Sequence, residues 1–218
     1  MPIVRCVNLS KSYDGELVFK DLTLELDEGD ALAVLGPSGS GKTTLLKIIG
    51  LLLRPSSGVL YIDDVDVTGL REAQLSELRR KYISYSFQEP TFIPHLDIMD
   101  NILIPIIPWV SREELKKYRD KALDLLDRLG LKGLEKRRPD DLSTGQRKRA
   151  DLARALLKDP KILIVDEPTA NLDEESADVI RAIIREVRDM NKVVIFALHR
   201  DRKLVRQANK KLNIERFK

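Results

Sequence analysis

The stretch VLGPSGSGKTTLL, residues 34–46, decides the fold of this chain. It contains a glycine, four further residues and then Gly-Lys-Thr, a pattern typical of a phosphate-binding loop between a strand and a helix. The small loop residues let successive backbone N–H groups turn toward an anion. The helix that begins near Lys42 directs the positive end of its dipole to the same place. We therefore predict that the loop binds a polyphosphate; a plain Gly/Ser turn is the alternative.

The predicted phosphate contacts come from the loop and from the first residues of the helix. Among them, Lys42 is suited to the terminal phosphates, and the Thr43 hydroxyl is suited to a magnesium ion. The full set is Gly36, Pro37, Ser38, Gly39, Ser40, Gly41, Lys42, Thr43 and Thr44.

The composition indicates a folded protein without a strong preference for one sign of charge. The chain has 218 residues, of which 43% are hydrophobic, enough for the core of one elaborated domain or two small ones. The charged fraction is 33% but the net charge is only +3, so both signs are interspersed. Such a surface has no global field that would recruit nucleic acid or an anionic membrane, and no nucleic-acid partner is expected.

The cysteine content and the apolar segments indicate a reducing, cytoplasmic setting. Cys6 is the one cysteine and cannot form an internal disulfide, and the start MPIVRC lacks the apolar run of a signal peptide. The longest apolar stretches, residues 45–53 and 102–110, are shorter than the ~18 residues that a membrane-spanning helix requires. We expect any membrane role to go through a partner.

The pattern along the chain predicts an α/β fold with three parts. Residues 1–88 contain strand-like segments, the phosphate loop with a helix over 43–53, and a short strand pair over 56–66. Residues 89–159 contain helices: Ser111 and Glu114 form a capping box for one that ends at Gly130, and another covers 143–158.

Residues 160–218 return to the core. Two continuous apolar runs, 161–165 and 193–198, are typical of strands buried on both faces of a parallel sheet, and an amphipathic helix covers 173–188 between them. We predict an α/β core with a mainly parallel sheet, an N-terminal antiparallel β part and an inserted helical subdomain. The basic tail, 200–218, predicts an exposed helix face, with contact to anionic headgroups as the alternative.

Polar residues follow both buried strands. Asp166 and Glu167 end the first strand, and His199 ends the second. Because ligands of open α/β sheets bind at the carboxyl ends of the strands, we expect all three beside the phosphate loop. Asp166 is suited to a magnesium ion held with Thr43, and Glu167 to orienting or deprotonating a water that attacks the γ-phosphorus. Solvated carboxylates and a structural histidine are the alternatives.

Taken together, these residues resemble a known family. The motifs, in chain order, are the loop at 36–43, Gln88, Leu142-Ser143-Thr144-Gly145-Gln146, residues 162–167, Asn171-Leu172-Asp173, and His199. In this combination the chain resembles the ATPase subunit of an ABC transporter. The resemblance implies a P-loop NTPase fold, ATP and Mg²⁺ as ligands, and ATP hydrolysis coupled to transport through separate integral membrane subunits.

The resemblance also implies roles for residues outside the loop. Two chains would face each other head to tail, with ATP between the phosphate loop of one and Ser143, Thr144, Gly145 and Gln146 of the other. Tyr13 would stack on the adenine, and a half-buried sheet residue is the alternative reading of this aromatic. Gln88 would contact the magnesium or the attacking water and relay the nucleotide state to the membrane partner. Asp173 would work at the dimer seam, and His199 would contact the γ-phosphate.

The segment 92–96, Phe-Ile-Pro-His-Leu, is similar to the branch that serves lipoprotein release and macrolide export. Two positions depart from the family pattern: Thr144 stands where glycine is usual, and Arg200 follows His199 where aspartate is common. If Thr144 keeps a negative φ, the half-site stays competent, which favours a homodimer over an asymmetric heterodimer.

Some alternatives stay open at this stage. Residues 98–110, with Trp109, line either a groove for a helix of the membrane subunit or the interior of the helical block. An ABC-type ATPase of nucleic-acid repair or translation is the rival function, and a small-molecule kinase is a second one. The compact block between Lys42 and Asp166 disfavours the nucleic-acid or translation ATPase. The 142–146 segment disfavours the small-molecule kinase. The cargo is not encoded in these motifs.

Overall fold

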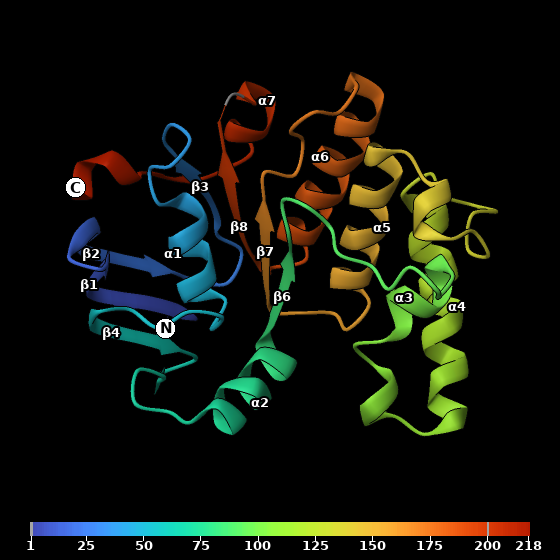
Figure 1. The fold of residues 1–218 in the computed structure, drawn as a ribbon, viewed down its shortest axis with the longest axis horizontal. Helices are drawn as coiled ribbons and strands as arrows, with labels where there is room; N and C mark the ends of the chain where they lie inside the picture. The colour runs from blue at the N-terminus through green and yellow to red at the C-terminus, as the bar shows by residue number, and fades with distance from the viewer. Residues whose placement is uncertain (1, 200) are drawn as a thin grey trace.

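The computed structural model describes residues 2–199 and 201–218 and contains two β-sheets. Arg200, one of the two departures from the family pattern, lies outside the described residues. Figure 1 shows the antiparallel sheet at one end of the molecule, the parallel sheet in the middle and the helical block at the other end. This is the α/β arrangement that the sequence predicts, and the fold class is confirmed.

The N-terminal part forms the antiparallel sheet. A hairpin at its edge turns through Asp14 and Gly15, which both have positive φ, 48° and 86°. In order across the sheet, the strands are β2 (Glu16–Leu26), β1 (Val4–Tyr13), β4 (Ser57–Ile62) and β5 (Val65–Asp66).

The second sheet is parallel at every pairing. Its central strands are fully buried, as the continuous apolar runs predict. In order across the sheet, the strands are β6 (Ile83–Ser86), β7 (Ile162–Asp166), β8 (Val193–Leu198), β3 (Ala31–Leu35) and β9 (Lys210–Asn213).

Each face of the parallel sheet belongs to a different core, because side chains alternate along a strand. In β7, Ile162 and Ile164 pack with α1 (Lys42–Ile49) and the antiparallel sheet. Leu163 and Val165 pack with the helices on the other face. Those helices are α5 (Thr144–Leu156) and α6 (Glu174–Asp189), seen on the opposite side of the sheet from α1 in Figure 1.

The helical block follows β6 in the chain and ends in α5. Its predicted capping box forms at Ser111, whose hydroxyl accepts from Glu114 N at 3.2 Å, and the helix ends before Gly130 at φ 66°. The buried face of this helix holds Ala122, Leu125 and Leu126. The elements before α5 are α3 (Ile98–Leu103), η1 (Ile107–Trp109), α4 (Arg112–Arg128) and η2 (Pro139–Asp141).

The structure differs from the sequence predictions in a few elements. α1 stops at Ile49 because Gly50 caps it and Leu51 takes a positive φ of 57°, so the predicted end at residue 53 is wrong. Before β6 lies a helix that was not predicted, α2 (Glu72–Tyr82).

The predicted helix of the basic tail is wrong in length, and the tail packs on the core through three apolar side chains, whereas most of its described lysines and arginines are exposed as predicted. It consists of a short helix α7 (Arg202–Val205), β9 and a final turn η3 (Ile214–Phe217). β9 pairs with β3, and Leu204, Leu212 and Ile214 are buried. β9 lies at the edge of the sheet, where a strand needs an apolar side chain on one face only. Its two lysines therefore give no apolar run from which the strand could be predicted. In residues 2–199 and 201–218, no helix is both long and apolar enough to cross a membrane.

Candidate active site

The phosphate loop connects β3 to α1. Gly41 caps the helix at φ 100°, and a Cβ there would lie 2.6 Å from Val18 Cγ1 in β2. At this position the backbone conformation and the close approach of β2 both require glycine. The loop is therefore held against the antiparallel sheet at the N-terminus of α1, which favours an anion.

Lys42 lies inside the loop. Its Nζ donates to Gly36 O and Pro37 O, both at 2.9 Å, and the residue is 5% exposed. A hollow of about 310 Å³, here called the phosphate hollow, opens beside it and is bordered by Val18, residues 38–44, Gln88 and Glu167. An ammonium and several backbone N–H groups around a space of this size suit a polyphosphate.

Asp166 ends β7 beside this hollow and fits a divalent cation. It is 3% exposed, and its Oδ2 accepts from the Tyr85 hydroxyl at 3.4 Å, whereas Oδ1 has no hydrogen-bond partner. Burial raises the pKa of Asp166, and the Glu167 carboxylate adds to this, while the Thr43 hydroxyl and Lys42 oppose it. A buried carboxylate oxygen without a partner gains most from a cation.

Magnesium suits this donor set. The described part of the chain holds no cluster of three or more His, Cys, Asp or Glu side chains that could enclose a metal. Mg²⁺ commonly takes only one or two protein ligands and completes its shell with phosphate oxygens and water. Asp166, the Thr43 hydroxyl and the Gln88 amide are the side chains that would hold it.

Glu167 stands next to Asp166 at the start of a turn and has a φ of 47°. Its Oε2 accepts from Gln88 Nε2 at 3.3 Å, so these two predicted site residues meet at the phosphate hollow. Its backbone is held on two sides: Glu167 N donates to Ala197 O at 3.2 Å, and Lys148 Nζ donates to Glu167 O at 3.0 Å.

His199 follows β8, the parallel neighbour of β7. It borders a second hollow of about 390 Å³, here called the His199 hollow, together with Ser38 and Glu167. The structure therefore places Asp166, Glu167 and His199 at one edge of the sheet beside the loop, where the strand ends predict them.

Tyr13 ends β1 and is 46% exposed, with Lys11 Nζ 4.7 Å from its ring centroid. Val18, in the paired strand β2, borders the phosphate hollow. The ring is therefore on the hairpin that lies against the loop and presents an open face.

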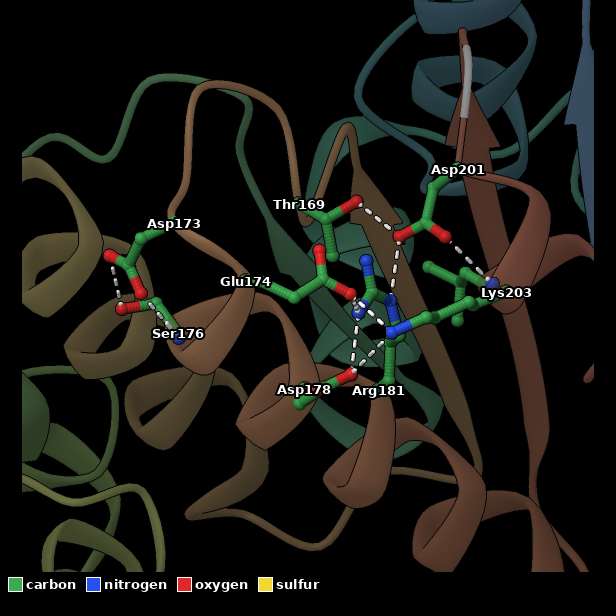
Figure 2. A network of polar contacts seen from close by, with 9 residues as sticks. Thr169, Asp173, Glu174, Ser176, Asp178, Arg181, Asp201 and Lys203 are labelled. Carbon is green, nitrogen blue, oxygen red and sulfur yellow. Dashed lines mark hydrogen bonds and ion pairs between the residues drawn. The ribbon is translucent and has the colours of Figure 1, made fainter.

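The other predicted site residues gather elsewhere. Ser143 caps α5, with its hydroxyl accepting from Gln146 N at 3.2 Å, and Asp173 caps α6, accepting from Ser176 N at 2.8 Å. Figure 2 shows the Asp173–Ser176 pair. A Cβ at Gly145 would lie 3.1 Å from Ser176 Oγ, so the two helix starts touch.

This second set does not border the phosphate hollow or the His199 hollow. The exposed residues Ser143, Thr144 and Asp173 thus form a separate polar surface at two helix N-termini. Such a surface can accept an anion from outside the chain.

Two residues that sequence reasoning missed connect these parts. Lys148 is buried on α5 and donates to Glu167 O and to Ala170 O at 3.0 and 2.8 Å. Asp151 is 1% exposed on the same helix and accepts from the Ser86 hydroxyl at 2.7 Å and Phe87 N at 3.1 Å. The available signal for Asp151 was its position three residues before Arg154, between alanines and a leucine of α5, where the two opposite charges can pair on one face of the helix.

A groove lies where the helical block meets β6. It has a volume of about 500 Å³ and is bordered by Phe87, Thr91, Pro105 and Arg154, among others. Trp109, beyond this groove in η1, is 62% exposed, and the Arg80 guanidinium lies 5.0 Å from its ring centroid. Trp109 therefore does not fill the interior of the helical block. For the rest of the segment 98–110 the interior alternative is correct, since Ile98, Met99, Ile102, Leu103 and Ile106 are buried in the core of that block.

Comparisons with known proteins identify the family of the chain. A family model described as "ABC transporter" matches residues 19–170. The chain is 36% identical over 202 residues to the lipoprotein-releasing system ATP-binding protein LolD of Bdellovibrio bacteriovorus, covering 91% of each chain. It is 40% identical over 192 residues to the phosphonates import ATP-binding protein PhnC 2 of Synechococcus sp., covering 85% of this chain and 71% of that protein.

Among solved structures, a dimeric post-hydrolysis state of the ATP-binding cassette MJ0796 bound to ADP and Pi aligns with a TM-score of 0.88. Its sequence identity to this chain is 31%, over 97% of this chain and 95% of that one.

Proposed function

This chain belongs to the ABC transporter family as an ATP-binding and ATP-hydrolysing subunit, and we propose that it drives substrate movement through separate membrane proteins by nucleotide-driven dimerisation. One observation carries the proposal. The phosphate loop, Gln88 and Glu167 share one hollow, whereas Ser143 and Asp173 lie on a different surface of the same chain. A site that uses both sets needs two chains.

The proposed mechanism assigns each group a task. Lys42 and the loop N–H groups bind the β- and γ-phosphates, and Tyr13 stacks on the adenine. When bound, Mg²⁺ neutralises charge on the phosphate oxygens. Glu167 accepts a proton from the attacking water or orients it, while Gln88 holds the Glu167 carboxylate in place.

His199, which borders the His199 hollow with Ser38 of the phosphate loop, contacts the γ-phosphate. Ser143 and the N-terminus of α5 in the second chain complete the γ-phosphate contacts, since a helix start favours an anion. Every group named for one half-site is present in this chain, which supports a homodimer.

The names of the relatives refer to different cargoes, phosphonates for one and lipoproteins for another. We infer that the cargo is selected by the membrane subunits, and that this chain works on the cytoplasmic face of the membrane through them. The test measures ATP turnover alone, with duplex DNA and with the membrane protein that co-purifies with the chain. Stimulation by the membrane protein supports the proposal, and stimulation by DNA would favour the nucleic-acid alternative.

Trp109→Ala tests the contact with the membrane subunit. We expect weaker co-purification and a nearly unchanged melting temperature, because the indole is mostly exposed and loses little buried area. A buried tryptophan would instead cost about 3–5 kcal/mol. Leu123→Ala, an exposed apolar side chain on α4, is the matched control and should change neither quantity. A marked fall in the melting temperature of Trp109→Ala would contradict this placement.

Thr144→Gly tests the half-site. Thr144 is the first residue of α5 and is not among the residues with positive φ, so threonine is unstrained there. We expect ATP turnover to change less than about tenfold, since glycine at this position costs the helix at most about 1 kcal/mol. Turnover is compared at saturating ATP and high protein concentration. A hundredfold rise with glycine would mean that the half-site is impaired and would favour a heterodimer.

A further inference from the structure

Three segments of the chain meet at the carboxylate of Asp201. Its Oδ2 accepts from the Thr169 hydroxyl at 2.8 Å and from Arg181 Nε at 2.9 Å, and its Oδ1 accepts from Leu204 N at 2.9 Å. Figure 2 shows these contacts around the guanidinium of Arg181, which projects from α6. Thr169 comes two residues after Glu167, and Asp201 comes two residues after His199.

The charges at this junction are buried and matched. The side chains of Arg181 and Asp201 are each 9% exposed. Burial acts to raise the pKa of Asp201, but the hydrogen bonds from Leu204, Thr169 and Arg181 outweigh it and lower the pKa. The carboxylate is therefore charged near neutral pH and keeps both oxygens as acceptors.

Arg181 is in turn held by the start of its own helix. Its NH1 donates to Glu174 at 3.0 Å and to Asp178 at 2.6 Å, and Lys203 contacts both of those carboxylates. Burial acts to lower the pKa of Arg181, but the three carboxylates raise it. The guanidinium thus stays charged and is fixed from two sides, which makes it a rigid support for Asp201.

The Thr169–Asp201 bond joins the two loops that carry Glu167 and His199. The β7–β8 pairing ends with Asp166 opposite Ala197, and Glu167 N makes the last backbone bond, to Ala197 O. Beyond that point, and within the part of the chain that the structure describes, the Thr169–Asp201 bond is the direct hydrogen bond between the loops. Thr169 and Asp201 also border the His199 hollow, together with Glu167 and His199.

We propose that Asp201, supported by Arg181 and tied to Thr169, is a positioning residue that sets His199 relative to Glu167 during ATP hydrolysis. The proposal rests on the roles of Glu167 and His199 in the proposed function. Because catalysis depends on the geometry of the reacting groups, a looser His199 loop slows the chemical step more than it weakens nucleotide binding.

The test removes the hydroxyl of Thr169 and leaves its shape. Thr169→Val should lower kcat by about tenfold and change KM for ATP by less than about twofold. Thr169→Ser keeps the hydroxyl and should restore kcat to within about twofold of the parent protein. Thr23→Val is the matched control, since the Thr23 hydroxyl donates to Asn8 Oδ1 at 3.1 Å in the antiparallel sheet, and it should leave kcat unchanged.

A double-mutant cycle with His199 shows whether the effect acts through that residue. Thr169→Val should lower kcat by about tenfold in the parent protein and should lower the residual kcat of a His199→Ala background by less than about twofold. Melting temperatures identify any variant that fails to fold. If Thr169→Val does not fold, Asp201→Asn is measured in its place, and the same fall in kcat is expected.

Three results would overturn the proposal: an unchanged kcat in Thr169→Val, no rescue by Thr169→Ser, or equal effects of Thr169→Val with and without His199. The proposed function is judged separately, by turnover of the parent protein and its loss in Glu167→Gln, neither of which depends on Thr169.

Discussion

Glu167→Gln should reduce ATP turnover by about a hundredfold or more while ATP still binds, because a general base contributes on the order of 10²–10⁴ to the rate. Glutamine keeps the size of the side chain and can still pair with Gln88, but it cannot accept the proton of the attacking water. The bound ATP then stays intact. Because the triphosphate contacts both chains in the proposed dimer, the variant should remain associated.

Light scattering with ATP and Mg²⁺ at micromolar protein concentration detects this association, and phosphate release measures the turnover. Glu77→Gln, which changes an exposed carboxylate on α2, is the control and should behave like the parent protein. If Glu167→Gln stays monomeric with ATP, or hydrolyses at the parent rate, Glu167 is not the general base of a dimeric site.

Lys42→Ala should weaken ATP binding by about a hundredfold, which corresponds to about 2.7 kcal/mol. Lys42 is 5% exposed and its ammonium lies among the loop carbonyls, so its contact with a terminal phosphate is a charge-assisted bond. No other lysine or arginine borders the phosphate hollow within the described residues, so none is in place to substitute for it.

Titration calorimetry gives the dissociation constant for ATP in the parent protein and in the variant. Lys47→Ala is the matched control, since Lys47 lies on the exposed side of the same helix. The dissociation constants of Lys42→Ala and Lys47→Ala should differ by the full factor of about one hundred. Equal affinities would remove Lys42 from the phosphate site, and a collapse of the melting temperature in Lys42→Ala alone would mean that its main task is to hold the loop carbonyls.

Several structural features of this protein can be predicted from residues that lie close together in the sequence. The phosphate loop is defined by eight consecutive residues, and its glycine at position 41 is required by a local φ of 100°. Ser111, Ser143 and Asp173 each cap the helix that the sequence assigns to them, because a cap needs only a side chain and the N–H group two or three residues on. β7 and β8 can be predicted as buried strands because each has apolar side chains on both of its faces.

The two edge strands of the parallel sheet could not be predicted from an apolar run. β6 and β9 have only four residues each and contain serines or lysines, so neither has an apolar run that stands out. Both are strands because β7 and β3 offer them unpaired backbone groups. A pairing partner more than a hundred residues away in β3 gives no sign in the local sequence of β9.

The sequence alone thus determined the family pattern, the central sheet and the residues that gather at its carboxyl edge, since these follow from neighbours a few positions apart. Only the tertiary structure decided that Trp109 is exposed, that Ser143 and Asp173 form a surface apart from the phosphate hollow, and that Asp201 joins Thr169 to Arg181. At Asp201, for example, the contact with Arg181 joins residues 20 positions apart, and the contact with Thr169 joins residues 32 positions apart. A side chain's partner at such a separation depends on how the elements pack, which no local pattern of polarity or propensity records.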